Sequence, residues 1–281
     1  GFEFSATYRN RDHAFKYDIS ANLSTLKNKV TSLGIGKDSY ISGAYATYVG
    51  QEIGQFYGWV YEGIARTQAD LDNHATQQGV NVGDCLYKDI SGPEGTPDGV
   101  IDAYDQTVLG SGLPKVNFGL STHMEYKGFD LNISTYGVLN YHVSDDIYNS
   151  LNSCYGYGNK EVGMLDANRW SEDGTYLSSV PRTYAANNAT LAWNDLFSSR
   201  KIQNAAYWKI ANVELGYNFP DKWFGGYVSG VRLYVSAQNL YTFTGYHGYN
   251  VDYAGGTFTP GYNFCSFPSA RTFMAGLHFT F

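Results

Sequence analysis

Oxygen-bearing side chains recur at short intervals in one acidic stretch of the sequence. Calcium-binding loops place oxygen ligands at alternating positions, with a glycine that allows a sharp turn between them. Gly99 could supply that turn, although the segment from Gly92 to Pro97 widens the gap between the first and third ligands. The alternative is a solvated acidic turn that holds no ion. The candidate calcium ligands are Asp89, Ser91, Asp98, Asp102 and Asp105.

Aromatic residues in the long polar stretches form a second set of candidates. Large flat side chains with a polar edge can stack on sugar rings. The alternative is that they pack loop against loop or lie in an aromatic belt at a membrane interface. The candidate substrate-binding residues are Trp59, Tyr155, Tyr157, Trp193, Tyr246, Tyr249 and Tyr253.

Catalytic motifs are absent from the sequence. It contains no G-x-S-x-G, H-E-x-x-H or P-loop pattern, and its six histidines are scattered. Cys85, Cys154 and Cys265 lack the spacing of metal ligands, so one disulfide with a free thiol and three free thiols both remain open. We therefore predict that the protein is not an enzyme and has no cofactor other than the candidate calcium.

The composition is that of an aromatic, sparsely charged β protein. Charged residues make up 16% of the chain, below the roughly 25% of an average soluble domain, whereas the chain holds 26 Tyr and 32 Gly. The net charge of −7 argues against a nucleic-acid partner, because no basic stripe could neutralise phosphates. The sequence also has no run of about eighteen apolar residues, which a transmembrane helix would need.

Seven segments alternate between apolar and polar residues with the period of a β-strand. The last of them predicts a strand that ends on an aromatic residue, Phe281, and is long enough to cross a hydrocarbon layer of about 25 Å when tilted. The predicted strands are Phe2–Arg9, Phe15–Ser24, Val116–Tyr126, Phe129–Ser134, Asn212–Phe219, Val231–Gln238 and Arg271–Phe281.

The connections between these strands alternate strictly between short and long. Short turns lie near residues 10–13, 127–128 and 220–230, and long connections span about residues 31–114, 145–205 and 244–270. Transmembrane barrels have short periplasmic turns at one rim and long extracellular loops at the other. The alternation predicts an antiparallel transmembrane β-barrel with three external loops. The alternative fold is a β-sandwich, whose strands also alternate.

Seven strands alone would leave two open edges, which a lipid environment does not tolerate. We therefore expect the chain to be the C-terminal part of a larger barrel, beginning at an internal point of the parent sequence and ending at its true terminus. In such a barrel the polar faces of the strands line the interior. The polar residues expected there, to which no specific role is assigned, are His123, Glu125, Glu214, Arg232 and His278.

Several sequence motifs of the chain resemble those of the SusC/RagA-like TonB-dependent transporters of Bacteroidetes outer membranes. Val49–Trp59 is similar to the family pattern VGxPIGxFYGY, and Tyr87–Asp89 with Asp98–Asp105 is similar to YKDxNGDGxIDxxD. The similar segments occur in the expected order across essentially the whole chain. The others are Asn22–Val30, Thr107–Lys115, Arg169–Trp170, Tyr207–Tyr217, Leu233–Leu240 and Pro268–Phe273.

The resemblance implies a 22-stranded barrel that imports oligosaccharides or peptides across the outer membrane of a Gram-negative bacterium. It also implies a SusD-like surface lipoprotein that closes the mouth as a lid, and coupling to TonB through a plug domain. The plug and the N-terminal strands are not expected within this chain. Phe281 matches the terminal aromatic that barrel-assembly machinery recognises in such proteins. The rival functions are a surface or secreted β-sandwich that binds glycans without transport, and a diffusion porin without coupling.

Overall fold

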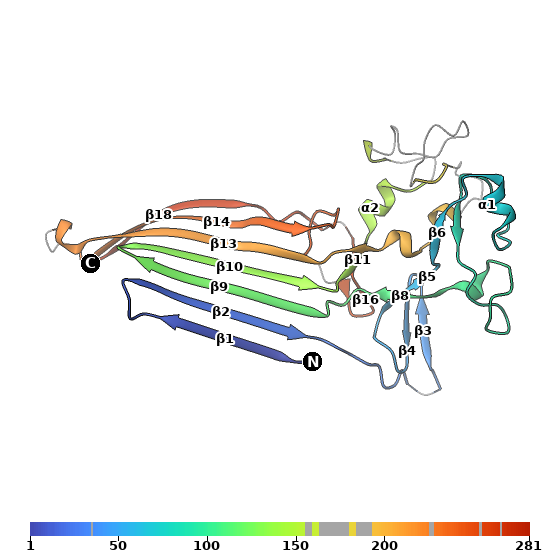
Figure 1. Ribbon diagram of the computed structural model, residues 1–281, viewed down its shortest axis with the longest axis horizontal. Helices are drawn as coiled ribbons and strands as arrows, with labels where there is room; N and C mark the ends of the chain where they lie inside the picture. The colour runs from blue at the N-terminus through green and yellow to red at the C-terminus, as the bar shows by residue number, and fades with distance from the viewer. Residues whose placement is uncertain are drawn as a thin grey trace.

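The computed structural model describes residues 1–34, 36–154, 159–162, 180–183, 193–224, 228–252, 255–264 and 266–281. Its central feature is a seven-stranded antiparallel sheet in which the strands pair in chain order (Figure 1). The predicted all-β fold of about seven long strands is confirmed. The strands are β1 (Glu3–Asn10), β2 (Phe15–Thr25), β9 (Val116–Tyr126), β10 (Phe129–Leu139), β13 (Tyr207–Phe219), β14 (Gly230–Thr244) and β18 (Thr272–Thr280).

Three strands extend further than the alternating pattern predicts. β10 continues to Leu139, β13 begins at Tyr207 and β14 continues to Thr244. The pairing of β13 with β14 shifts register between Ile210 and Asn212. In β13 an extra residue reverses the phase of alternation, so the period-two pattern ends there while the strand goes on. β10 pairs with β9 without a shift as far as Leu139, and its Tyr136 and Val138 pack in a loop core instead.

The register gives the sheet one polar and one apolar face. Paired residues on neighbouring strands point to the same side, and side chains alternate along each strand. One polar row across the sheet consists of Asp18, His123, Asn132, Glu214 and Ser236. The adjacent apolar row consists of Tyr17, Met124, Leu131, Leu215 and Val235.

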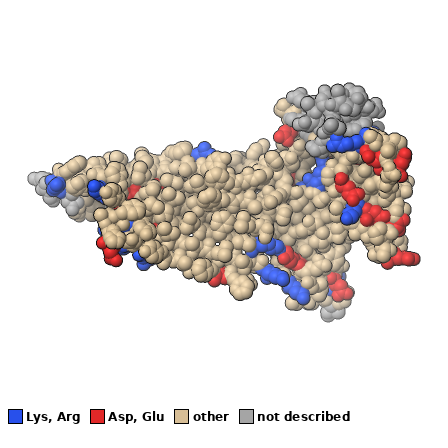
Figure 2. Space-filling view, viewed as in Figure 1, with Lys and Arg blue, Asp and Glu red and all other residues tan. Residues whose placement is uncertain are grey.

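The apolar face is exposed instead of packed against a second sheet. Phe4 is 64% exposed, Phe273 69% and Leu277 58%. Figure 2 shows few charged side chains over the long sheet and more of them at its two ends. In a β-sandwich this face would form the core. Among the described residues no second sheet covers it, so the sandwich alternative is not supported.

Aromatic residues form a band at each end of the apolar face. At the short-turn end, Phe129 contacts Tyr217 with 4.7 Å between ring centroids. At the other end, Trp208 stacks on Phe243 at 5.2 Å. Because Trp208 pairs with Gly137 of β10, the bands lie roughly 26 Å apart along the strand, or about 20 Å apart after a typical tilt. Barrels in membranes carry aromatic girdles around an apolar band of about 25 Å.

The long connections gather at one end of the sheet, opposite the short turns and the C-terminus (Figure 1). They contain short strands and helices that sequence alternation did not predict. None of the helices in the described part of the chain is long and apolar enough to span a membrane. The loop strands are β3 (Ser39–Ser42), β4 (Tyr45–Tyr48), β5 (Gln55–Gly58), β6 (Tyr61–Ile64), β7 (Cys85–Tyr87), β8 (Thr107–Ser111), β11 (His142–Asp145), β12 (Gln203–Asn204), β15 (Gly255–Gly256), β16 (Thr259–Pro260) and β17 (Tyr262–Asn263). The α-helices are α1 (Gln68–Asp72) and α2 (Asp146–Leu151), and 3₁₀ turns lie at Ala103–Asp105, Ser199–Lys201 and Asp221–Phe224.

A close approach of two backbones joins the first long connection to the third. A Cβ atom at Gly112 would lie 2.0 Å from the carbonyl oxygen of Pro260. Gly261, with φ of 74°, follows Pro260 in the third connection, and a Cβ atom there would lie 2.8 Å from the Cα atom of Gly112. Glycine is required where a backbone passes this closely. These loops are therefore docked on one another and not independent.

Candidate functional site

A charged network lies on the polar face of the sheet. The Arg232 guanidinium of β14 donates from Nε to Oδ2 of Asp130 at 3.0 Å and from Nη2 to Oε1 of Glu214 at 2.7 Å. Nη2 also donates to Oδ1 of Asp130, and the Asn218 amide donates to Oδ2 at 2.9 Å. Asp130 is only 5% exposed. The network ties β10, β13 and β14 together across the wall.

A second polar cluster lies beside it. The two ring nitrogens of His123 contact Oδ1 of Asn132 at 2.7 Å and Oε1 of Glu125 at 2.8 Å. Lys16 of β2 lies 3.8 Å from Glu125. His278 of β18 pairs in register with Arg232, so it shares this face. The structure thus brings the five polar residues singled out in the sequence to one surface.

The first and second long connections are joined by a buried carboxylate, Asp84. Arg182 donates to it from Nε at 2.6 Å and from Nη2 at 2.9 Å, and the Asn194 amide donates at 2.8 Å. The Asp84 side chain is 2% exposed. A bidentate arginine–carboxylate pair fixes both position and orientation. Sequence reasoning missed this pair, because its members are about a hundred residues apart.

Two of the predicted aromatic residues, Trp59 and Trp193, come together in the same loop assembly. Their ring centroids are 6.4 Å apart, and each ring also contacts Tyr87. The group packs against buried Cys85 and Ile101. The Trp193 indole donates to the carbonyl of Gln78 at 2.8 Å. These contacts favour the alternative interpretation, in which the rings pack loop against loop.

Burial of Cys85 makes a direct chemical prediction. Removal from water raises the pKa of its thiol from 9.0 to about 12. Alkylation requires the thiolate, so at pH 8.5 we expect Cys85 to react about a thousandfold more slowly in the folded protein than in denaturant. Mass spectrometry of the Cys85 peptide after iodoacetamide treatment measures both rates. Similar rates with and without denaturant would show that the loop core is open.

The other predicted aromatic residues differ in their surroundings. Tyr246 is 7% exposed, and its hydroxyl contacts Asp145 and the Asn263 amide, the latter at 2.8 Å. Burial raises the pKa of the Tyr246 phenol, and the neighbouring Asp145 carboxylate adds to the shift. Tyr249, in contrast, is 61% exposed. Tyr155, Tyr157 and Tyr253 lie outside the described residues.

The acidic stretch folds as a hydrogen-bonded loop. Asp105 is fully buried, and its carboxylate accepts backbone N–H bonds from Ile90 at 2.7 Å and Asp102 at 2.8 Å. The Asp102 carboxylate accepts from Tyr104, Asp98 from Val100 and Asp89 from Gly99. Ser91 donates to a backbone carbonyl. Among the described residues, no group of three or more acidic, His or Cys side chains is placed to hold a metal ion, so the calcium prediction gains no support.

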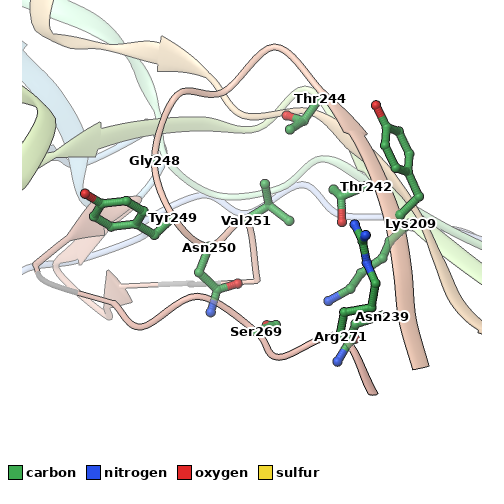
Figure 3. A pocket seen from close by; sticks show the side chains of 11 residues that line it. Lys209, Asn239, Thr242, Thr244, Gly248, Tyr249, Asn250, Val251, Ser269 and Arg271 are labelled. Carbon is green, nitrogen blue, oxygen red and sulfur yellow. The ribbon is translucent and has the colours of Figure 1, made fainter. Parts of the chain in front are cut away.

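A polar pocket of about 340 Å³, which we term the mouth pocket, lies where β14 meets the third long connection (Figure 3). Lys209 and Arg271 bring positive charge to it, and Asn239, Thr242, Tyr249 and Asn250 bring amides and hydroxyls. Of these, the sequence singled out only Tyr249. Lys209, the residues from Asn239 to Asn250, and Arg271 come from separate segments of the chain, and no spacing pattern connects them.

Known proteins are similar to this chain in sequence and in fold. The TonB-dependent receptor P3 of Formosa agariphila is 30% identical over 300 residues, which include all of this chain and 28% of the receptor. The TonB-dependent receptor SusC of Bacteroides thetaiotaomicron is 25% identical over 296 residues, again with all of this chain and 26% of its own length. Over its whole length the chain is similar to one segment of TonB-dependent receptors of the SusC-like kind.

The chain spans less than a third of the length of these curated relatives. A solved structure of the RagAB peptide transporter superposes with a TM-score of 0.77 over 99% of this chain and 28% of that chain, at 20% identity. The RagAB importer in its closed-closed state gives a TM-score of 0.76. At this identity the likeness establishes the fold, a segment of a transmembrane β-barrel. No protein-family model matches the sequence.

Proposed function

We propose that this chain forms part of the wall and the external loops of an outer-membrane importer for oligosaccharides or peptides. The observation that carries the proposal is the contrast between the two faces of the sheet. One face exposes large apolar side chains between two aromatic bands, as lipid contact requires. The other carries networks such as that of Arg232, Asp130 and Glu214, which suit an aqueous interior.

The surroundings of this wall follow from the same proposal. The membrane is the outer membrane of a Gram-negative bacterium, with the long connections outside the cell and the short turns in the periplasm. We propose that residues 1–281 contribute seven strands to a barrel of 22, and that the remaining strands and the plug come from the rest of the parent protein. The plug, driven by TonB, would open the passage that this wall encloses.

The docked external loops are proposed to receive a SusD-like lipoprotein lid. Contacts between the loops support this proposal. Asp84 and Arg182 join the first connection to the second, and Gly112 packs against Pro260 of the third. A rigid, preorganised surface loses less entropy when a partner binds. The chain itself is proposed to act without catalysis, as a wall and a binding surface.

Substrate contact is proposed for the exposed Tyr249 at the mouth pocket. Trp59 and Trp193 are buried in part within the loop core, so we assign them a packing role that supports this surface. Tyr155, Tyr157 and Tyr253 remain candidates for stacking on cargo, and Tyr246 serves as an anchor for the third connection through Asp145.

Growth of a strain that lacks the parent gene tests the importer. We expect the deletion to abolish growth on one oligosaccharide or peptide mixture, and the full-length gene to restore it only when TonB is present. Restoration without TonB would identify a diffusion porin instead. A wild-type growth pattern of the deletion strain on the whole panel would remove the basis for the proposal.

A further inference from the structure

The mouth pocket has an uncompensated positive charge. No acidic side chain lies among the described residues that line it, although the whole chain carries a net charge of −7. Its two cations are Lys209 on β13 and Arg271 just before β18. In Figure 3 the side chains of Lys209, Thr242 and Arg271 gather on one side, opposite Tyr249 and Asn250. A local positive site on an acidic protein attracts anions selectively.

The two cations differ in how they are held. The Lys209 side chain is 5% exposed and its ammonium donates to Oδ2 of Asp252 at 2.6 Å, so most of its charge is already paired. Arg271 is exposed and takes part in none of the ion pairs formed by the described residues. Arginine presents a planar fork of donors that fits a carboxylate with two parallel hydrogen bonds. Arg271 is therefore the group that is available to a ligand.

The remaining walls of the pocket supply further hydrogen-bonding groups. β14 pairs with β18 only as far as Gln238, opposite Thr272, whereas β14 itself continues to Thr244. Beyond that point, no strand of the described residues pairs with this edge of β14. Asn239, with φ of 51°, begins the free edge, and its amide donates to the carbonyl of Ala270 at 2.9 Å. That bond fixes the segment carrying Arg271 against the pocket floor.

We propose that the mouth pocket binds a carboxylate group of the cargo, with Arg271 as its main ligand. The hydroxyls of Thr242 and Ser269 and the free edge of β14 then receive the polar atoms next to that carboxylate. This inference rests on the proposed import function and gives it a substrate class. An acidic peptide and an oligosaccharide that contains uronic acid present the same carboxylate chemistry.

The test measures binding by the full-length transporter in detergent with two matched pairs of probes. One pair is hexaglutamate and hexaglutamine, and the other is oligogalacturonate and its methyl ester. We expect one of the two anionic probes to bind in preference to its neutral counterpart, which identifies the source of the carboxylate. We also expect Arg271→Gln to weaken that binding about tenfold or more, because charged hydrogen bonds are lost.

Control variants separate recognition from folding. Arg66→Gln removes the same charge from an exposed position in the first connection and is expected to leave binding unchanged. Arg271→Lys keeps the charge but loses the fork, so an intermediate affinity is expected. Heat-dependent migration on gels confirms that each variant is a folded barrel.

Two outcomes would overturn the carboxylate proposal: equal affinity of the wild type for charged and neutral probes, or an unchanged affinity after Arg271→Gln. TonB-dependent uptake of a neutral nutrient in that case would leave the importer function standing. Anion binding without any uptake would instead support the carboxylate site and contradict the proposed import function.

Discussion

Arg232→Met is expected to destabilise the barrel by about 2–4 kcal/mol. The substitution removes the partner of Asp130, which is 5% exposed, and leaves Glu214 beside it with no opposing charge. Breaking a buried ion pair by removing one member costs about 3–5 kcal/mol, and the lower estimate here allows for an arginine side chain that is 24% exposed. The midpoint of guanidinium unfolding of the full-length protein in lipid vesicles measures the change.

Two comparisons show whether the ion pair is the cause. Arg9→Met changes the same residue type on the same face of the sheet, at an exposed position outside the ion pairs of the described residues, and should shift the midpoint little. Adding Asp130→Asn to Arg232→Met should recover part of the loss, because the stranded charge disappears. An Arg232→Met barrel as stable as the wild type would mean that the interior is wet enough to solvate both carboxylates.

Asp84→Ala is expected to release the first long connection from the second. The carboxylate accepts from Arg182 at two positions, from the Asn194 amide and from the backbone N–H of Asn81 at 2.9 Å. Its loss leaves the Arg182 guanidinium without its carboxylate and the buried Asn194 amide with only the Arg182 carbonyl as acceptor, at 3.1 Å. Because the Arg182 side chain is 26% exposed, we expect a cost of about 2–4 kcal/mol of local stability. Amide hydrogens of Cys85–Tyr87 should then exchange about a hundredfold faster or more.

Hydrogen exchange followed by mass spectrometry reads this opening without requiring the barrel to unfold. Asp38→Ala, which removes an exposed carboxylate from the same connection, serves as the control and should leave exchange unchanged. The sheet strands should keep their protection in both variants, because Asp84 lies outside the seven-stranded sheet. Slow exchange in the Asp84→Ala loop would show that the aromatic core around Tyr87 suffices to hold it.

Arg232 and Asp84 stabilise different parts of the molecule. The Arg232 network holds the wall, and the Asp84 network holds the loops that would meet cargo and lid. If the loops open while the barrel stays intact, binding at the mouth can be separated experimentally from assembly of the wall. The Arg271 variants then report on recognition alone.

Local alternation in the sequence predicts the long strands, their two faces and the order of short and long connections between them. Period-two alternation is written locally, so segments such as Val116–Tyr126 could be recognised from neighbouring residues alone. The alternation failed near Ile210, where a bulge changes the phase of β13 without ending the strand. It also failed in β10 beyond Ser134, where Tyr136 and Val138 pack in a loop core, and it predicted none of the short loop strands. The resemblance to known transporters added the expectation of a barrel of 22 strands, because short motifs occur in the family's order along the chain.

The contacts within the loops, in contrast, are visible only in the folded structure. The pairing of Asp84 with Arg182, the contact of Trp59 with Trp193 and the approach of Lys209 to Arg271 all join residues distant in sequence. Polar contacts in irregular loops do not recur at a regular spacing, so no local sequence pattern predicts them. The acidic spacing between Asp89 and Asp105 predicts an ion, and the structure adds that these carboxylates accept backbone N–H groups of their own loop. Which side chains meet is decided by the path of the backbone, and that path exists only once the loops have packed.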